Sequence, residues 1–255
     1  MSRSSDVQNF INEANRVTEV SQLKDLLDGI VRSMGFHYFA LVHHVDIHAL
    51  PSDSVQMIEY PPHWAEMMMA HDYFAEDPVA AACQKVANGF EWTNVGNIIS
   101  LTTRQKDILT SAKTVGLGDG FTIPVHIPGE YAGSCSFSVQ WGKEFQQEAM
   151  PALQYVGLFS FEAARRIYKT SDPGYSRTSM SATPPALTGR QLDCVVLAAR
   201  GKSDWDMAQL LGISRDTVHQ HLEEAKRRYG VHSRVQLIVR ALFDSRLTFA
   251  DLVGR

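Results

Sequence analysis

Residues 207–221, Met-Ala-Gln-Leu-Leu-Gly-Ile-Ser-Arg-Asp-Thr-Val-His-Gln-His, decide the fold of the C-terminal part of this 255-residue chain. Gly212 and Ile213 interrupt an apolar helical pattern with a tight turn, because glycine reaches the left-handed backbone conformation at little cost. Ser214 then begins a second helix as its N-cap, since its hydroxyl accepts a hydrogen bond from a free backbone N–H group. The stretch therefore predicts a helix-turn-helix, whose second helix lies in the major groove of DNA.

Two capping boxes predict further helices of the same module. Thr188 pairs with Gln191, and Ser203 pairs with Asp206. In each pair, the two side chains satisfy each other's free backbone N–H groups. Gly201 ends the first helix, and a fourth helix follows the recognition helix. The residues expected to face the core are Leu192, Val195, Val196 and Ala199 in the first helix, Met207, Leu210 and Leu211 in the second, Val218, Leu222, Ala225 and Tyr229 in the third, and Val235, Ile238, Val239 and Leu242 in the fourth.

The other face of the recognition helix carries the candidate DNA contacts. Gln220 is suited to pair with adenine, Glu223 to accept a hydrogen bond from cytosine, and His219 to donate one to guanine. Hydroxyl and ammonium groups suit phosphates, which fix register without reporting sequence. The alternative is that these side chains form only the solvated face of a helical bundle. We predict that Arg215, Asp216, His219, Gln220 and Glu223 face bases and that Lys202, Ser214, Thr217 and Lys226 contact phosphates.

The charge is divided unevenly along the chain. Residues 186–255 contain 11 Lys and Arg against 8 Asp and Glu, a net charge of +3, whereas residues 1–185 contain 13 against 20, a net charge of −7. A mildly basic segment joined to an acidic one is typical of a DNA-binding module attached to a domain with a different task.

The N-terminal part alternates between helical and strand patterns. Helices before, between and after a run of antiparallel strands predict an α+β fold, an α-β-α sandwich around a central antiparallel sheet. This domain precedes the all-α four-helix module. The expected helices span residues 7–14, 23–34, 63–71, 78–86, 103–115 and 144–168, and the expected strands span residues 36–47, 55–60, 121–127 and 133–141.

A stretch with three prolines, four serines and no apolar periodicity separates the two parts. This composition is typical of an interdomain linker. We therefore expect an N-terminal domain over residues 1–170, a linker over residues 171–186 and the DNA-binding domain over residues 187–255.

The sequence argues against several other classes of protein. No apolar run approaches the roughly 20 residues that span a bilayer, and no signal-peptide core is present, so we expect a cytoplasmic protein without membrane contact. Cys83, Cys135 and Cys194 are widely spaced, which predicts buried thiols rather than disulfides or a zinc site. His43 and His44 would point to opposite faces of a strand, so neither a metal nor a cofactor is expected. No catalytic set has motif support, so we do not expect an enzyme.

The N-terminal motifs resemble those of the LuxR family of quorum-sensing transcription regulators. They are Tyr60-Pro-x-x-Trp64, Tyr73-Phe-x-x-Asp77-Pro-Val79, Phe90-x-Trp92 and Gly120-Phe-Thr-Ile-Pro. The resemblance covers nearly the whole chain and implies an autoinducer-binding and dimerisation domain that encloses an N-acyl homoserine lactone. It also implies a homodimer that binds a palindromic promoter element, with RNA polymerase as a further candidate partner.

The resemblance assigns roles to individual side chains. Trp64 would donate its indole N–H to the lactone carbonyl, Asp77 would accept from the ligand amide, and Tyr60 and Ser136 would contact the amide carbonyl. Without the resemblance, a tryptophan is more often a core residue, and Asp77 before a proline is a good helix N-cap by itself. Further candidates for the cavity wall are Ile47, Met68, Met69, Val79, Trp92 and Thr122.

Met68 departs from the family pattern, which usually has tyrosine there. The change removes a hydroxyl and adds a flexible apolar chain, so the acyl group is expected to be branched or aromatic. Two alternatives stay open. One is a family member that senses a non-lactone compound, for example from a plant. The other is a constitutive DNA binder whose N-terminal domain binds a partner protein.

Overall fold

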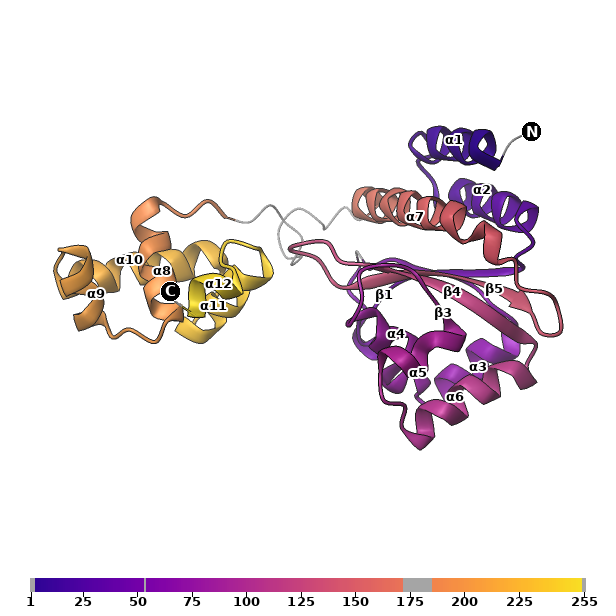
Figure 1. Ribbon diagram of the computed structural model, residues 1–255. Helices are drawn as coiled ribbons and strands as arrows, with labels where there is room; N and C mark the ends of the chain where they lie inside the picture. Colours follow the sequence, from indigo (N-terminus) through magenta and orange to yellow (C-terminus); the bar gives the residue numbers. More distant parts are fainter. Residues whose placement is uncertain (1–2, 53, 172–184, 254–255) are drawn as a thin grey trace. The chain divides into compact units, whose positions relative to one another are not determined.

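The computed structural model describes residues 3–52, 54–171 and 185–253, and the chain divides into two compact units (Figure 1). The N-terminal unit combines helices with a sheet, and the C-terminal unit is helical. Residues 172–184, which make up most of the predicted linker, lie outside the described residues. Within the described ranges, no helix is both long enough and apolar enough to cross a membrane.

The N-terminal unit is the predicted α-β-α sandwich. Its sheet has the strand order β2-β1-β5-β4-β3, and every neighbouring pair is antiparallel. The first, second and seventh helices cover one face, and the third to sixth helices cover the other (Figure 1). The helices are α1 (Arg3–Ala14), α2 (Val20–Ser33), α3 (Pro62–Ala70), α4 (Pro78–Cys83), α5 (Val95–Ile98), α6 (Thr103–Thr114) and α7 (Met150–Ser171), and the strands are β1 (Tyr38–His43), β2 (Gln56–Glu59), β3 (Phe90–Glu91), β4 (Leu117–Val125) and β5 (Gly133–Gln140).

The central strand β5 is buried on both faces, but the two faces differ in chemistry. Cys135 faces α7, where a Cβ atom added to Gly157 would lie 3.3 Å from the Cβ atom of Cys135. Side chains alternate along a strand, so Ser134, Ser136 and Ser138 point toward the layer formed by α3 to α6. Because buried hydroxyl groups are costly without hydrogen-bond partners, this serine-lined face is suited to a polar occupant.

Several elements differ from their predicted bounds, and β3 and α5 were not predicted. The helix α7 begins at Met150 rather than near residue 144, because a short 3-10 turn over Gln147–Ala149 precedes it. The strand β4 begins at Leu117, inside the glycine-rich segment. Gly116 has φ +90°, which allows the chain to reverse there, and a Cβ atom on Gly118 would lie 2.8 Å from the carbonyl oxygen of Val139.

The C-terminal unit contains α8 (Gly189–Ala199), α9 (Asp204–Leu211), α10 (Arg215–Tyr229), α11 (Arg234–Phe243) and the short α12 (Phe249–Val253). Both predicted capping boxes are present, at Thr188 and at Ser203, and Ser214 caps α10 as predicted. Gly212 has φ +65° and ends α9, so the helix-turn-helix forms as expected.

Three residues of this unit were predicted to face its core but do not. Leu210, Val235 and Val239 have exposed fractions of 61%, 69% and 59%. Leu237 and Ala241 of α11 are buried in their place. On α11, the predicted apolar face is therefore rotated around the helix axis relative to the face that is buried. A short helix with apolar residues on several sides does not define its buried face by itself.

Candidate ligand cavity and recognition helix

A cavity of about 860 Å³ lies in the N-terminal unit, and its volume is within the range of small-molecule sites. Strands β1, β2 and β5 contribute residues to it, as do α3, α4 and α6. The predicted ligand residues that line it are Ile47, Tyr60, Trp64, Met68, Val79, Asp77, Trp92 and Ser136.

Asp77 is a buried titratable group of the cavity. Its Oδ1 atom accepts a hydrogen bond from the backbone N–H of Val79 at 2.8 Å, so the side chain caps α4. Burial raises the pKa of this carboxyl to about 6, against a smaller opposite effect of the hydrogen bonds from Val79 and Ala80. Burial also raises the pKa of Tyr60, whose hydroxyl hydrogen-bonds to Ser136. Tyr60 is therefore a neutral hydroxyl donor or acceptor.

A chain of hydrogen bonds fixes the aromatic wall of the cavity. The indole Nε1 of Trp92 donates to Oγ1 of Thr122 at 2.8 Å, and this oxygen lies 2.8 Å from Oγ of Ser136. A Cβ atom on Gly120 would lie 2.5 Å from the ring of Trp92, so the ring packs directly on the backbone of β4. Thr122 is fully buried and does not line the cavity; it orients Trp92 and Ser136 instead of forming the predicted wall.

The helix α3 places Trp64 and Met68 on one face, because residues i and i+4 lie one above the other. Both are buried and line the cavity. Met69 lies about 100° further around the helix, is 62% exposed and does not line the cavity. The prediction that Met69 forms part of the wall is therefore wrong.

Several lining residues were not predicted. Phe74, Leu101, Ile108 and Leu117 complete the apolar surface, and their signal was indistinguishable from that of ordinary core residues. His44, Gln56 and Ser134 also line the cavity. Ser134 had a usable signal, because it lies two positions before Ser136 on the same strand and must share its face.

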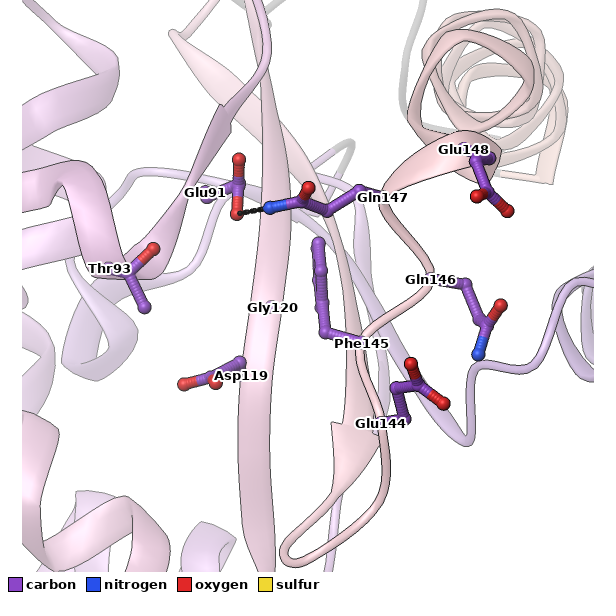
Figure 2. Close-up of a pocket in the computed structure, with 9 residues that line it drawn as sticks. All are labelled: Glu91, Thr93, Asp119, Gly120, Glu144, Phe145, Gln146, Gln147 and Glu148. Atoms are coloured by element: carbon purple, nitrogen blue, oxygen red, sulfur yellow. Dashed lines mark hydrogen bonds between the residues drawn. The ribbon is translucent and has the colours of Figure 1, made fainter.

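A second hollow of about 380 Å³ in the same unit has a different character (Figure 2). Four acidic residues line it, at positions 91, 119, 144 and 148, and Nε2 of Gln147 donates to Oε2 of Glu91 at 3.3 Å. Within the described part of the chain, no group of three or more histidine, cysteine, aspartate or glutamate side chains is arranged to hold a metal ion.

The recognition helix α10 exposes most of its predicted DNA contacts. Arg215, Asp216, His219, Gln220 and Glu223 are exposed, as are Ser214 and Lys202. The hydroxyl of Ser214 accepts from the backbone N–H of Thr217 at 3.0 Å and lies 2.8 Å from its hydroxyl, so the two side chains begin the helix together.

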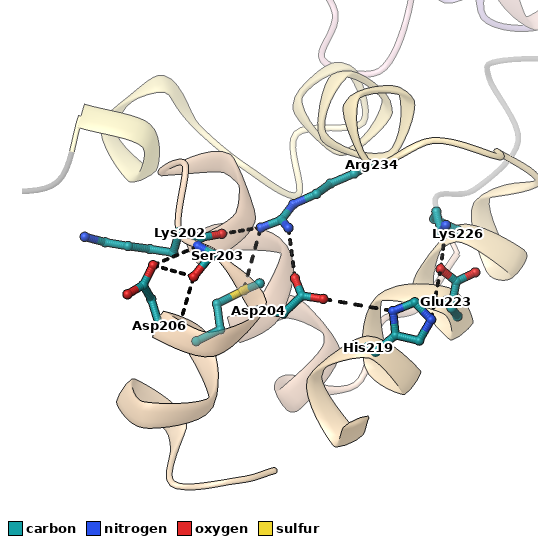
Figure 3. Close-up of polar contacts among 9 residues, drawn as sticks. Lys202, Ser203, Asp204, Asp206, His219, Glu223, Lys226 and Arg234 are labelled. Carbon is teal, nitrogen blue, oxygen red and sulfur yellow. Dashed lines mark hydrogen bonds and ion pairs between the residues drawn. The ribbon is translucent and has the colours of Figure 1, made fainter. Parts of the chain in front are cut away.

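Two of the predicted contacts are already paired with each other. Nζ of Lys226 lies 2.6 Å from Oε1 of Glu223, and this ion pair lowers the pKa of the carboxyl (Figure 3). The imidazole of His219 lies between Glu223, at 3.9 Å, and Asp204, at 4.0 Å. Glu223 and Lys226 therefore bind each other in this structure, whereas Gln220 is exposed.

Arg234 ties α11 to the start of α9. Its Nη1 atom donates to Oδ1 of Asp204 at 3.0 Å, and its Nη2 atom donates to the backbone oxygen of Lys202 and lies 4.0 Å from the sulfur of Met207 (Figure 3). This forked contact fixes the start of α9, where Lys202 is exposed.

The chain matches two protein-family models. A model described as the autoinducer-binding domain covers residues 19–164, and a model described as bacterial regulatory proteins of the luxR family covers residues 185–241. Together they span most of the unit that holds the cavity and most of the helical unit.

Similar proteins cover nearly the full length. The transcriptional activator AhyR of Aeromonas hydrophila is 25% identical over 238 residues, or 91% of this chain and 88% of AhyR. RpaR of Rhodopseudomonas palustris, an HTH-type quorum sensing-dependent transcriptional regulator, is 24% identical over 241 residues, 91% of each chain. The crystal structure of Escherichia coli SdiA has the same fold, with a TM-score of 0.68 at 18% identity over 96% of this chain and 98% of SdiA.

Proposed function

This chain belongs to the LuxR family of bacterial regulatory proteins, and we propose that the signal it binds is an N-acyl homoserine lactone. Its autoinducer-binding domain and its DNA-binding helix-turn-helix make it a transcription regulator rather than an enzyme. The observation that carries the proposal is that Tyr60, Trp64, Asp77 and Ser136 all line one largely apolar cavity.

The polar groups of such a ligand match these four side chains. The indole N–H of Trp64 donates to the lactone carbonyl, and the carboxylate of Asp77 accepts from the amide N–H. The hydroxyls of Tyr60 and Ser136 donate to the amide carbonyl. This pairing is needed, because each buried polar group of the ligand without a partner would cost about 1–3 kcal/mol. Met68 and Trp92 supply apolar surface, which favours a branched or aromatic acyl group.

The DNA-bound form is a homodimer in this proposal. Two copies of α10 then occupy half-sites of a palindromic promoter element about one helical turn apart. Exposed apolar side chains support association: Tyr155 and Leu158 on α7, and Val235 and Val239 on α11. RNA polymerase is the expected further partner of the promoter-bound protein.

Acyl homoserine lactones should stabilise the purified full-length chain. At a hundredfold excess over Kd, the bound form gains about 2.7 kcal/mol, which raises the melting temperature by roughly 5–10 °C for a domain of this size. A panel of straight, branched and aryl lactones followed by differential scanning fluorimetry tests this. Ring-opened acyl homoserines are the matched control and should give smaller shifts. If no lactone of any chain type shifts the transition, the signal belongs to another chemical class.

Two alanine variants test the proposed division of DNA contacts. Gln220→Ala should relax the preference for one base pair by about 1–3 kcal/mol while leaving binding to unrelated DNA unchanged. Lys202→Ala should weaken binding to all sequences and reduce the slope of log K against log salt by about one. Fluorescence anisotropy on promoter variants at several salt concentrations measures both. Identical behaviour of the two variants would contradict the assignment.

A further inference from the structure

The floor of the cavity has a second polar region, two residues along β5 from Ser136. Ser134 lies there, directly across from Val42 of β1, and Gln56 of β2 lies across from Val42 on its other side. His44 follows Val42 on the cavity side of the same chain segment. All of these residues line the cavity. Residues on one face of a strand repeat every two positions, or about 7 Å. Ser134 therefore lies about 7 Å along β5 from Ser136.

His44 and Ser134 are the centre of this region. Nε2 of His44 lies 2.9 Å from Oγ of Ser134. Nδ1 of His44 is also buried, and none of the described residues forms a hydrogen bond with it. Burial lowers the pKa of the imidazole to about 4, and His43 and His126 act in the same direction. At neutral pH the ring is uncharged, with one nitrogen that donates and one that accepts.

The neighbouring histidine is not part of this arrangement. The ring of His43 packs edge-on against Phe161 of α7 at 5.1 Å between centroids, on the other side of the sheet. Its Nδ1 atom accepts from the backbone N–H of Val55 at 3.0 Å. The two histidines therefore point to opposite faces, as the alternation of a strand predicts. His43 also borders the cavity, but its ring packs against Phe161 of α7.

We propose that His44, held in place by Ser134, binds a neutral hydroxyl group at the far end of the acyl chain, so that the ligand is a homoserine lactone whose tail carries an alcohol or a phenol. The inference rests on the proposed function, because the lactone and amide must occupy Trp64, Asp77, Tyr60 and Ser136 for the tail to reach this pair.

A hydroxyl fits this pair in either tautomer of His44. If Ser134 donates to Nε2, then Nδ1 carries the proton and a ligand oxygen accepts from it. If Nε2 donates to Ser134, then Nδ1 accepts and a ligand O–H donates to it. A carbonyl satisfies only the first case, and an alkyl tail satisfies neither, leaving a buried nitrogen unpaired at a cost of about 1–3 kcal/mol. A carboxylate could accept in the first case only, and its charge would stay unpaired, because burial opposes a charged imidazole.

Two synthetic ligands that differ by one oxygen test the proposal. They are the 4-hydroxyphenylacetyl and phenylacetyl amides of homoserine lactone, whose single ring spans about the 7 Å step between the polar regions. By calorimetric titration, the wild-type full-length chain should bind the hydroxylated ligand at least about tenfold more tightly. The variant His44→Leu should bind the two ligands with affinities within about twofold of each other. Ser134→Ala leaves the imidazole without its partner at Nε2 and should reduce the preference for the hydroxylated ligand.

Ser136→Ala is the matched control, since it removes the same atom two positions along the same strand. It should weaken both ligands by a similar factor and keep the preference for the hydroxyl. Equal affinity of the wild type for the two ligands overturns the inference and leaves the proposed function intact. The inference is also overturned, with the proposed function intact, if the chain binds an alkanoyl homoserine lactone but binds neither of the two aryl ligands. Failure to bind any lactone overturns the proposed function and the inference with it.

Discussion

Replacing Asp77 with asparagine should lower the affinity for an acyl homoserine lactone by about 100-fold and abolish ligand-dependent promoter activity. The carboxylate is the only anionic acceptor expected at the ligand amide, and a hydrogen bond to a charged group contributes about 1.5–3 kcal/mol. Asparagine also presents an N–H group that can face the ligand N–H. Calorimetric titration measures the affinity, and a reporter fusion measures the activity.

The asparagine variant separates ligand binding from folding. Asp77 caps α4 through the N–H of Val79, and asparagine is an equally good N-cap, so the melting temperature without ligand should not fall. Asp77→Ala removes the cap as well and should cost about 1 kcal/mol more. Wild-type promoter activity in both variants would mean that the N-terminal domain does not act through this ligand.

The pH dependence of binding provides a further check on Asp77. Its carboxyl has a pKa of about 6 in the fold, against 3.8 as the ordinary value. The folded chain therefore holds this proton more tightly than the unfolded chain does. The resulting stabilisation is fully present below about pH 4 and is lost as pH rises through about 6, by roughly 3 kcal/mol in total. Because the ligand amide needs the ionised form, affinity should rise between about pH 5 and pH 7, and Asp77→Asn should remove this rise.

Replacing Arg234 with alanine should destabilise the C-terminal unit by about 2–3 kcal/mol and weaken DNA binding at least tenfold, with no change in lactone affinity. The side chain makes charge-assisted hydrogen bonds to Asp204 and to the backbone of Lys202, and each bond of this kind contributes about 1.5–3 kcal/mol. Its loss also leaves the carboxylate of Asp204, which is only 24% exposed, without its cation.

The matched control is Arg190→Ala. Arg190 is 57% exposed and lies 3.8 Å from Asp193 in a surface pair, which contributes only about 0–1 kcal/mol. Scanning calorimetry of the full chain and anisotropy with promoter DNA test both variants. If Arg234→Ala melts and binds DNA like Arg190→Ala, the link between α9 and α11 does not position the recognition module.

The sequence predicted the helix-turn-helix in detail because its signals are local. The capping pairs at Thr188 and Ser203 and the turn at Gly212 act within four residues, and the structure contains all three. The buried faces of α9 and α11 were less accessible to prediction. Whether Leu210 or Ala208 faces inward depends on where the neighbouring helices lie, which no local pattern contains.

The cavity could be predicted only in part, for a similar reason. Motif spacing pointed to Trp64 and Asp77, and the family resemblance pointed to Ser136. All three line the cavity. Met69 and Thr122 do not line the cavity. Met69 follows Met68 by one residue and therefore points about 100° away from it around the helix. Thr122 is buried beneath the ring of Trp92. His44 could not be predicted as a ligand residue. Strand alternation predicts which face of the sheet its side chain occupies, but it does not predict that Ser134 of the neighbouring strand is its hydrogen-bond partner.

The distribution of the four tryptophans has an optical consequence. Trp64 and Trp92 line the cavity, whereas Trp141 and Trp205 are 53% and 63% exposed. Indoles in apolar surroundings fluoresce at shorter wavelengths than indoles in water, and iodide quenches only those that it can reach. In the presence of iodide, the remaining short-wavelength emission of the unlabelled protein therefore reports directly on what occupies the cavity.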